Sequence, residues 1–358
     1  MKRLQRPRLL IASALAPLMV LAACGGGSGD EENSAGSASG CEDSKLRLSH
    51  QWPAATGGED GDFRSELAQQ FADKVDEATD GGVAVQIFPG SSLVESTEQY
   101  DAMMQGAVDL SVFPLDYASG RVPDFSVTLM PALVRNHEQA QAWQDAEIGQ
   151  RLEEVMDENG IKVLTWVWNA GAIGAKGADP IVAPDDVKQG MTMRAAGSYV
   201  EGMLKDAGAG ISSLPSNEIY TAMQTGVLDA AVTSTGSFAS YNLQEQVQTF
   251  TSPTENTFWF MFEPLIISNE AFEGLCPEHQ DALVSVGEEL QEFAYTASEE
   301  DDTRVEKLFA DAGVEVVTMD DDAFAQWQEL AQKQWDKFAS SAPNGEELME
   351  LAKEASGQ

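Results

Sequence analysis

Basic residues are scarce in this sequence. Its 358 residues include 21 Lys and Arg against 59 Asp and Glu, which gives a formal net charge of −38. Nucleic-acid-binding proteins need clustered Lys and Arg to neutralise phosphates, so the composition excludes that class. The same excess of acidic groups is repelled by an anionic membrane surface. Cysteine is also rare, and three residues are too few for a fold built on disulfides.

Common catalytic and metal-binding motifs are missing as well. The sequence has no G-x-S-x-G elbow, no H-E-x-x-H helix and no Gly-rich phosphate loop after a predicted strand. His50, His137 and His279 show no metal-ligand spacing, and the acidic clusters at 299–302 and 320–322 lack the alternating oxygen ligands of a calcium loop. We therefore expect no enzyme, no cofactor and no metal site.

The composition is that of a globular protein. Apolar residues make up 43% of the chain and aromatic residues 8%, which is enough for a packed interior. Because single hydrophobic cores stop growing well before this length, we expect two domains.

The N-terminus has the pattern of a secretory signal. A basic start is followed by an apolar run from Leu9 to Ala23, which is too short to span a bilayer and matches a signal-peptide core. The run ends in Leu-Ala-Ala before Cys24, a segment that resembles the lipobox of bacterial lipoproteins, in which the cysteine is lipidated. An ordinary signal peptide with a chance cysteine is the alternative. We predict a signal peptide over 1–23 and an extracytoplasmic protein anchored to the membrane only by lipid on Cys24.

A tether separates this anchor from the folded body. Residues 25–40 are mostly Gly, Ser, Ala, Asp and Glu, a composition typical of flexible linkers, so we assign 24–43 to the lipidated cysteine and its tether. Cys41 and Cys276 lie beyond it, in an oxidising compartment. The sequence leaves open whether they pair in a disulfide or are two separate buried thiols.

The body contains an internal repeat. Residues 98–109 and 218–229 both read E-x-Y-x-A-M-x-x-G-x-x-D. The pattern predicts an amphipathic helix, a glycine near its end and then a short strand. Apolar segments at 83–88 and 211–214, each followed by a turn, precede the two copies. Two α/β lobes of related design are therefore expected.

One arginine lies where such folds bind ligands. Residues 191–194 alternate as a strand, and a turn and a helix over 198–207 follow. Ligands of open α/β sheets bind beyond the carboxyl ends of strands, near helix N-termini. Arg194 at this strand end can hold a carboxylate through two parallel hydrogen bonds. A surface arginine or a structural ion pair is the alternative, but the scarcity of basic residues and the position favour a ligand role.

From Leu46 to about Trp335 the chain resembles the solute-binding component of tripartite ATP-independent periplasmic (TRAP) transporters, the dicarboxylate-binding DctP-type family. The resemblance is carried by the strands at 46–50 and 81–89 and by the glycine and aspartate of each repeat. The segment 190–194, Gly-Met-Thr-Met-Arg, resembles the family's Gly-Leu-Lys-Ile-Arg, whose arginine pairs with a substrate carboxylate. Glu218 begins a match to the family's Glu-x-Tyr-x-Ala-x-Gln-x-Gly-x-x-Asp run.

The resemblance implies an α/β periplasmic-binding-protein fold of the Venus flytrap type. Two lobes close over a small organic acid, strands form the hinge, and a long helix, expected over 277–312, spans both lobes. The implied divisions are 44–169 for lobe I, 170–258 for lobe II, 259–298 for a return to lobe I with the start of the long helix, and 299–358 for the lobe II side and the C-terminal helices.

The resemblance also implies further ligand-binding positions beside Arg194. These are Gln51 after the first strand, Glu95 at the start of the first repeat helix, Phe113 after the strand that follows Asp109, Asn169 at the end of a strand over 163–168, Glu218, and Thr233 after the strand that follows Asp229. Each also has a simpler role: Gln51 and Asn169 as turn caps, Phe113 as a core residue and Glu95 as a helix N-terminal charge.

The sequence departs from the family at one basic position. Many members have a second arginine shortly after the position of Asn169, whereas residues 169–174 here contain none. Lys176 is the nearest basic residue, but an ammonium is a point charge on a flexible stem. The departure argues against a doubly charged substrate.

The predicted function is therefore binding. We expect a lipoprotein that captures a small organic acid between its lobes and delivers it to the integral membrane subunits of a TRAP-type secondary transporter. The alternatives are a ligand-binding lipoprotein that feeds an ATP-driven transporter or a sensor, and a surface-anchored hydrolase on the same fold.

Overall fold

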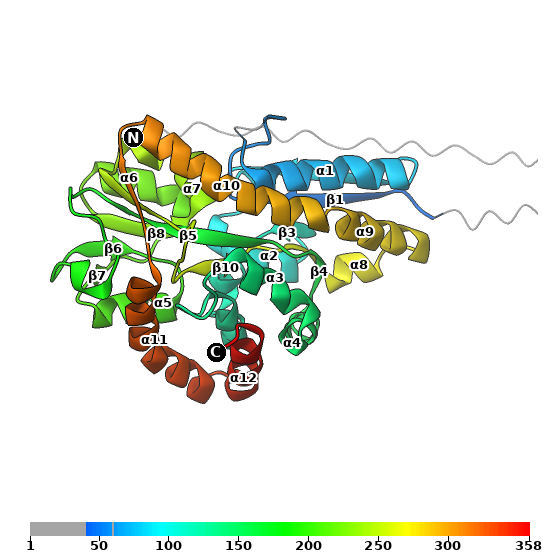
Figure 1. The fold of residues 1–358 in the computed structure, drawn as a ribbon. Helices are drawn as coiled ribbons and strands as arrows, with labels where there is room; N and C mark the ends of the chain where they lie inside the picture. The colour runs from blue at the N-terminus through cyan, green and yellow to red at the C-terminus, as the bar shows by residue number, and fades with distance from the viewer. Residues whose placement is uncertain (1–40, 59–60) are drawn as a thin grey trace, which may run out of the picture. The chain divides into compact units, whose positions relative to one another are not determined.

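The computed structural model describes residues 41–58 and 61–358. Two β-sheets organise this part of the chain (Figure 1). The first sheet has the order β2-β1-β3-β11-β4. Its strands are β1 (Ser44–Ser49), β2 (Val83–Phe88), β3 (Leu110–Val112), β4 (Ile161–Thr165) and β11 (Leu265–Ser268). We call the part of the molecule built on this sheet lobe I.

The second sheet has the order β12-β9-β5-β8-β6-β7, with β10 also paired to β5. Its strands are β5 (Trp168–Ala175), β6 (Thr192–Arg194), β7 (Gly210–Ile211), β8 (Ala230–Ser234), β9 (Thr249–Ser252), β10 (Phe260–Phe262) and β12 (Glu315–Thr318). We call the part built on it lobe II. This two-lobed α/β arrangement agrees with the predicted fold class.

Helices cover both sheets. They are α1 (Phe63–Ala78), α2 (Gln99–Met104), α3 (His137–Asp145), α4 (Glu147–Glu158), α5 (Ser198–Asp206), α6 (Ile219–Gln224), α7 (Thr235–Ser240), α8 (Asn269–Glu273), α9 (Pro277–Glu289), α10 (Gln291–Asp311), α11 (Asp321–Ser341) and α12 (Gly345–Ala355). Several begin at a side chain that accepts a backbone N–H, as Asp62 does for α1 and Asp320 for α11. Short 3₁₀ helices join other elements, among them η1 (Ser96–Glu98), η2 (Leu115–Ala118), η3 (Pro123–Leu129) and η5 (Ser216–Glu218).

The sequence repeat is visible in the topology. The units β1-α1-β2-α2-β3 and β6-α5-β7-α6-β8 have matching parallel orders, β2-β1-β3 and β7-β6-β8. The repeat glycines, Gly106 and Gly226, have φ of 65° and 77°, a backbone region that favours glycine. Asp109 Oδ2 accepts the backbone N–H of Arg47 at 2.7 Å, and Asp229 Oδ2 accepts that of Thr192 at 2.9 Å. The glycine and the aspartate of each repeat therefore stabilise the lobe to which they belong.

The chain crosses between the sheets where a single strand was expected. We predicted a strand over 163–168 that ends at Asn169, and this is wrong: β4 ends at Thr165 and Asn169 lies inside β5. The chain leaves the first sheet after Thr165 and enters the second at Trp168, so the two halves of one apolar run pair with different sheets. The lobe boundaries given above stay a prediction.

The expected long helix over 277–312 is two helices. α9 packs against α1 and β4, whereas α10 packs against α1 and also against α7 and β5, so it spans both lobes (Figure 1). The helix breaks at Leu290 because the crossing chain intervenes: Thr165 Oγ1 donates to Gly287 O at 3.0 Å. The Gln291 side chain then forms hydrogen bonds of 2.8 Å to both the N–H and the carbonyl of Trp166.

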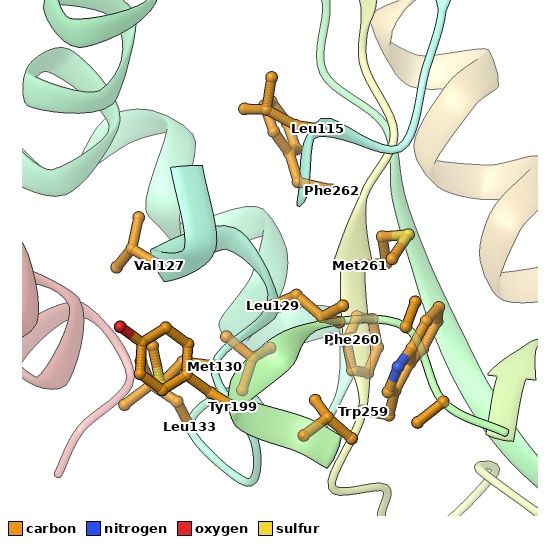
Figure 2. Close-up of a cluster of buried hydrophobic side chains, with 14 of the residues drawn as sticks. Leu115, Val127, Leu129, Met130, Leu133, Tyr199, Trp259, Phe260, Met261 and Phe262 are labelled. Atoms are coloured by element: carbon orange, nitrogen blue, oxygen red, sulfur yellow. The ribbon is translucent and has the colours of Figure 1, made fainter. Parts of the chain in front are cut away.

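A large apolar cluster packs the segment after β3 against lobe II. Figure 2 shows Leu115 of this segment beside Phe262 of β10, Leu129 near Phe260 of the same strand, and Tyr199 of α5 at the lower left of the cluster. All five side chains are buried, and burial of this kind contributes about 25 cal/mol per Å² of apolar surface. The cluster holds η2 beside the end of β6.

A disulfide closes the folded body at its N-terminal end. Cys41 and Cys276 are joined, with Cα atoms 5.7 Å apart. Cys276 is the residue before α9, so the bond ties the start of β1 to the start of that helix.

Candidate ligand-binding site

Arg194 is the last residue of β6 and is buried, with 1% exposure. Its Nε donates to Leu214 O at 2.9 Å, and its Nη1 donates to Val232 O at 2.8 Å. Its Nη2 donates to the Tyr117 hydroxyl at 3.1 Å. These three bonds fix the guanidinium plane at the strand end.

The Arg194 charge has no acidic partner within the described part of the chain. No Asp or Glu oxygen there lies within 4.0 Å of its guanidinium. Carbonyl and hydroxyl oxygens satisfy three of the five N–H groups but do not neutralise the charge. Burying an uncompensated guanidinium is costly. The site is therefore suited to an anion, and a carboxylate fits the remaining N–H groups.

Tyr117 brings lobe I to this arginine. It lies in η2, five residues beyond the end of β3, and Phe113 packs edge-on against its ring with centroids 6.3 Å apart. Its hydroxyl accepts from Arg194 and also from the backbone N–H of Ser216 at 3.2 Å. Both of these donors belong to lobe II, so the tyrosine joins the lobes at the anion site. We did not predict Tyr117 as a ligand residue.

Gln51 makes a second connection between the lobes. The Tyr241 hydroxyl, at the end of α7, donates to Gln51 O at 3.1 Å. Burial raises the pKa of Tyr241 far above its usual value, against the lowering effect of the Arg64 charge, so the hydroxyl is a neutral donor. The Gln51 side chain is 4% exposed and its Oε1 has no hydrogen-bond partner in the described structure.

A fully buried charge network lies next to these residues, centred on Arg64 of α1. Its guanidinium pairs with Asp62 at 2.6 Å and with Glu263 at 2.7 Å, and stacks 3.9 Å from the centre of the Trp52 ring. It also donates to Ser234 of lobe II at 3.0 Å. Since its two carboxylates outnumber it, Arg64 offers no free positive charge for a ligand.

The carboxylates of this network have opposite pKa shifts. Burial raises the pKa of Glu263 above its usual value, although Arg64 opposes the shift. For Asp62, burial has the same tendency, but the charge and hydrogen bonds of Arg64 outweigh it and lower the pKa. No sequence pattern predicts this network, because Glu263 and Ser234 are 199 and 170 residues away from Arg64.

Asn169 belongs to the Arg64 network. It is fully buried, donates to Glu263 Oε2 at 3.2 Å and accepts from the Thr235 hydroxyl at 3.3 Å. Thr233 was expected after a strand but lies inside β8, next to Val232, whose carbonyl accepts from Arg194. Neither side chain forms a hydrogen bond with Arg194 in the described structure.

The remaining predicted positions differ in their surroundings. Phe113 is fully buried in the main apolar cluster, as its simpler role implies. Glu95 and Glu218 are exposed; Glu95 precedes η1 without a capping hydrogen bond, and Glu218 ends η5. Lys176 donates to Met223 O at 2.6 Å beyond the far end of β5, so it does not replace the missing second arginine.

A surface cavity of about 680 Å³ lies elsewhere, between α1 and α10. Phe63 and Phe293 form part of its wall, and Glu66, Glu300 and Asp301 supply acidic groups. Its one basic lining residue, Arg304, is paired with Asp301. Because carboxylates dominate this cavity, we place the anion site at Arg194 instead.

Comparisons with known proteins show the family to which the chain belongs. The family model of bacterial extracellular solute-binding proteins, family 7 (DctP), matches residues 55–341. The chain is 41% identical to a solute-binding protein of Albidiferax ferrireducens, over 87% of this chain and 91% of that one. It is 28% identical to the 2,3-diketo-L-gulonate-binding periplasmic protein YiaO of Escherichia coli, over 82% and 88% of the two chains.

A solved structure shows the same fold. The TRAP periplasmic solute-binding protein of Rhodoferax ferrireducens, with bound malonate, superposes with a TM-score of 0.83 at 40% identity, over 87% of this chain and 98% of that one. These relatives are solute-binding proteins, in agreement with the prediction that the chain is not an enzyme. The resemblance inferred from the motifs is thereby confirmed, and the chain belongs to the DctP family of bacterial extracellular solute-binding proteins.

Proposed function

We propose that this protein captures a small organic carboxylate between its two lobes and delivers it to a TRAP-type secondary transporter. The observation that carries the proposal is the buried guanidinium of Arg194, which no described carboxylate neutralises. The malonate bound to the relative from Rhodoferax ferrireducens supports a carboxylate as the ligand. Integral membrane subunits are the partners that this family implies.

Closure follows from the way both lobes reach the anion site. Arg194 and Ser216 come from lobe II, whereas Tyr117 and Gln51 follow strands of lobe I. A ligand held by Arg194 and touched by lobe I residues binds the closed arrangement better than an open one, so it shifts the population toward closure. A transporter that recognises the closed form then receives only loaded protein.

The proposal includes an extracytoplasmic location and a lipid anchor. The signal peptide over 1–23 and Cys24 lie outside the described residues, and their assignment rests on the sequence pattern. Within the described ranges, no helix is long and apolar enough to cross a bilayer.

The test is a binding assay with a matched pair of arginine variants. Arg194→Ala is expected to raise the Kd for carboxylates by roughly 30-fold or more in calorimetry, because removing one partner of a desolvated charge pair costs about 2–5 kcal/mol. Arg121→Ala, at an exposed arginine paired with Asp101, is expected to leave the Kd unchanged. In a thermal scan, a saturating ligand stabilises the wild type but not Arg194→Ala.

Two outcomes contradict the proposal. An unchanged Kd in Arg194→Ala removes this residue from recognition. Product formation from any carboxylate in the panel, checked by chromatography of the incubated ligand, would instead support the hydrolase alternative.

A further inference from the structure

Two neutral side chains connected to Arg194 through Tyr117 and Tyr241 each contain a buried oxygen without a hydrogen-bond partner. Ser216 is 3% exposed and Gln51 is 4% exposed, and neither Ser216 Oγ nor Gln51 Oε1 has a partner within the described residues. Leaving a buried polar atom unpaired costs about 1–3 kcal/mol. Native proteins contain few such atoms, and each calls for an explanation.

A chain of neighbouring polar groups connects these side chains to Arg194. Arg194 Nη2 lies 3.1 Å from the Tyr117 hydroxyl, which lies 3.2 Å from the backbone N of Ser216. The Ser216 hydroxyl in turn lies beside the Tyr241 hydroxyl, without a well-formed hydrogen bond between them. Tyr241 donates to the backbone of Gln51. A ligand carboxylate on Arg194 therefore has neutral polar groups next to it rather than a second charge.

The hydrogen-bonding capacity of these groups is specific. The Tyr117 oxygen already accepts two hydrogen bonds, so its remaining role is to donate. The Ser216 hydroxyl and the Gln51 carboxamide both donate and accept. Together they match an oxygen that is itself neutral, such as a hydroxyl or a keto group.

A second carboxylate finds no such match. The other buried arginine among the described residues, Arg64, is already paired with Asp62 and Glu263. The charges of Asp62 and Arg64 both act on the Tyr241 hydroxyl, so a negative charge added near it would face a network with two carboxylates for one guanidinium. Desolvating that second charge without a counter-charge is unfavourable.

We propose that the preferred ligand is a monocarboxylate with a hydroxyl or keto oxygen on the neighbouring carbon. Arg194 holds the carboxylate, while Ser216 and Tyr117 bind the neutral oxygen and Gln51 closes over it from lobe I. This inference rests on the proposed capture of a carboxylate and narrows its class. It also predicts that the site binds a dicarboxylate less tightly than such a monocarboxylate.

The experiment uses sets of acids matched in carbon number. Each set of three, four or six carbons contains the unsubstituted monocarboxylate, its 2-hydroxy and 2-keto forms, and the dicarboxylate; propionate, lactate, pyruvate and malonate are the three-carbon set. Calorimetry on the full mature chain is expected to give a Kd at least ~10-fold lower for the hydroxy or keto acid than for the other two. A site built around a ligand hydroxyl rejects the analogue that lacks it.

Variants then assign the preference to residues. Ser216→Ala is expected to weaken binding of the hydroxy acid while the Kd of the unsubstituted acid changes little. The ratio of the two Kd values, unsubstituted acid to hydroxy acid, then falls close to one. Tyr117→Phe, which keeps the ring against Phe113, tests the same ratio if Ser216→Ala unfolds. Ser92→Ala, at an exposed serine, is the matched control and retains the wild-type ratio.

The outcomes separate the two proposals. If the dicarboxylate of a set binds as tightly as the hydroxy acid, and Ser216→Ala leaves the ratio unchanged, the preference for a neutral oxygen is overturned while carboxylate capture stands. If no acid binds and Arg194→Ala behaves as the wild type, both fail together.

Discussion

Arg64 and Arg194 are both buried guanidinium groups, yet their surroundings give them opposite roles. Arg64 has two carboxylate partners within 2.7 Å, whereas Arg194 contacts only carbonyl and hydroxyl oxygens. The first belongs to a structural ion-pair network, and breaking such a pair is strongly destabilising. Arg194 has no carboxylate partner among the described residues, so we expect the ligand to supply its counter-charge. Burial alone therefore does not mark a binding residue; the missing counter-charge does.

Asp116 offers a test of electrostatics between the lobes. Burial and the negative charge of Glu201 on α5 raise its pKa to about 7, although Ser126 opposes the shift. The folded protein thus keeps this proton between pH 4 and pH 7, while the unfolded chain, with a value of 3.8, loses it. The stabilisation is complete below the unfolded pKa and is lost as the pH rises through the folded pKa.

The variant Asp116→Asn removes this titration. We expect the unfolding free energy of the wild type relative to the variant to fall by up to ~4 kcal/mol between pH 4 and pH 8. Urea denaturation at both pH values measures the difference. A difference that does not vary with pH would mean that Asp116 is ionised in the folded protein throughout this range.

At the scale of elements, residue spacing correctly predicted the features that depend only on residues close in the sequence. Both repeat helices, their terminal glycines and the strands after them were found from spacing alone, since these features depend on neighbours within one unit. The turn after β6 was predicted for the same reason. Its position marked Arg194, at the strand end, as a candidate ligand-binding residue. The position of Asn169 and the break at Leu290 were not, because both depend on the crossing chain between the sheets. Tyr117 and Ser216 meet across 99 residues, which no periodicity reveals.

The close contact between α9 and β4 has a direct test. A Cβ added at Gly287 would lie 2.3 Å from the carbonyl oxygen of Leu164, and backbone cannot swing away as a side chain does. Gly287→Ala is therefore expected to lower the unfolding free energy by about 1–3 kcal/mol in urea denaturation, as overpacking typically does.

Gly120 is the matched control. A Cβ there meets no atom within 4 Å and φ is not positive, so Gly120→Ala is expected to stay within about 0.5 kcal/mol of the wild type. Equal behaviour of the two variants would show that α9 can move away from β4 without cost, and that the helix break is not imposed by this contact.

For the whole molecule, the net charge of −38 acts on the approach of an anionic ligand. Its field extends about 30 Å at 10 mM salt but only about 8 Å at 150 mM. The positive charge of Arg194 is buried and acts at short range, so the long-range field that an incoming carboxylate meets is repulsive. Salt should therefore help this ligand to associate, whereas it slows association between opposite charges.

Stopped-flow fluorescence with the best-bound acid measures this effect. We expect the association rate constant to rise by roughly 2–10-fold between 10 and 150 mM salt, while the dissociation rate constant changes little, because the bound ion is shielded from solvent ions. An association rate constant that falls with salt would show that the local field of Arg194 extends beyond the protein and steers the ligand in. In that case the acidic surface would lie away from the entrance, and the scarcity of basic residues would have no bearing on capture.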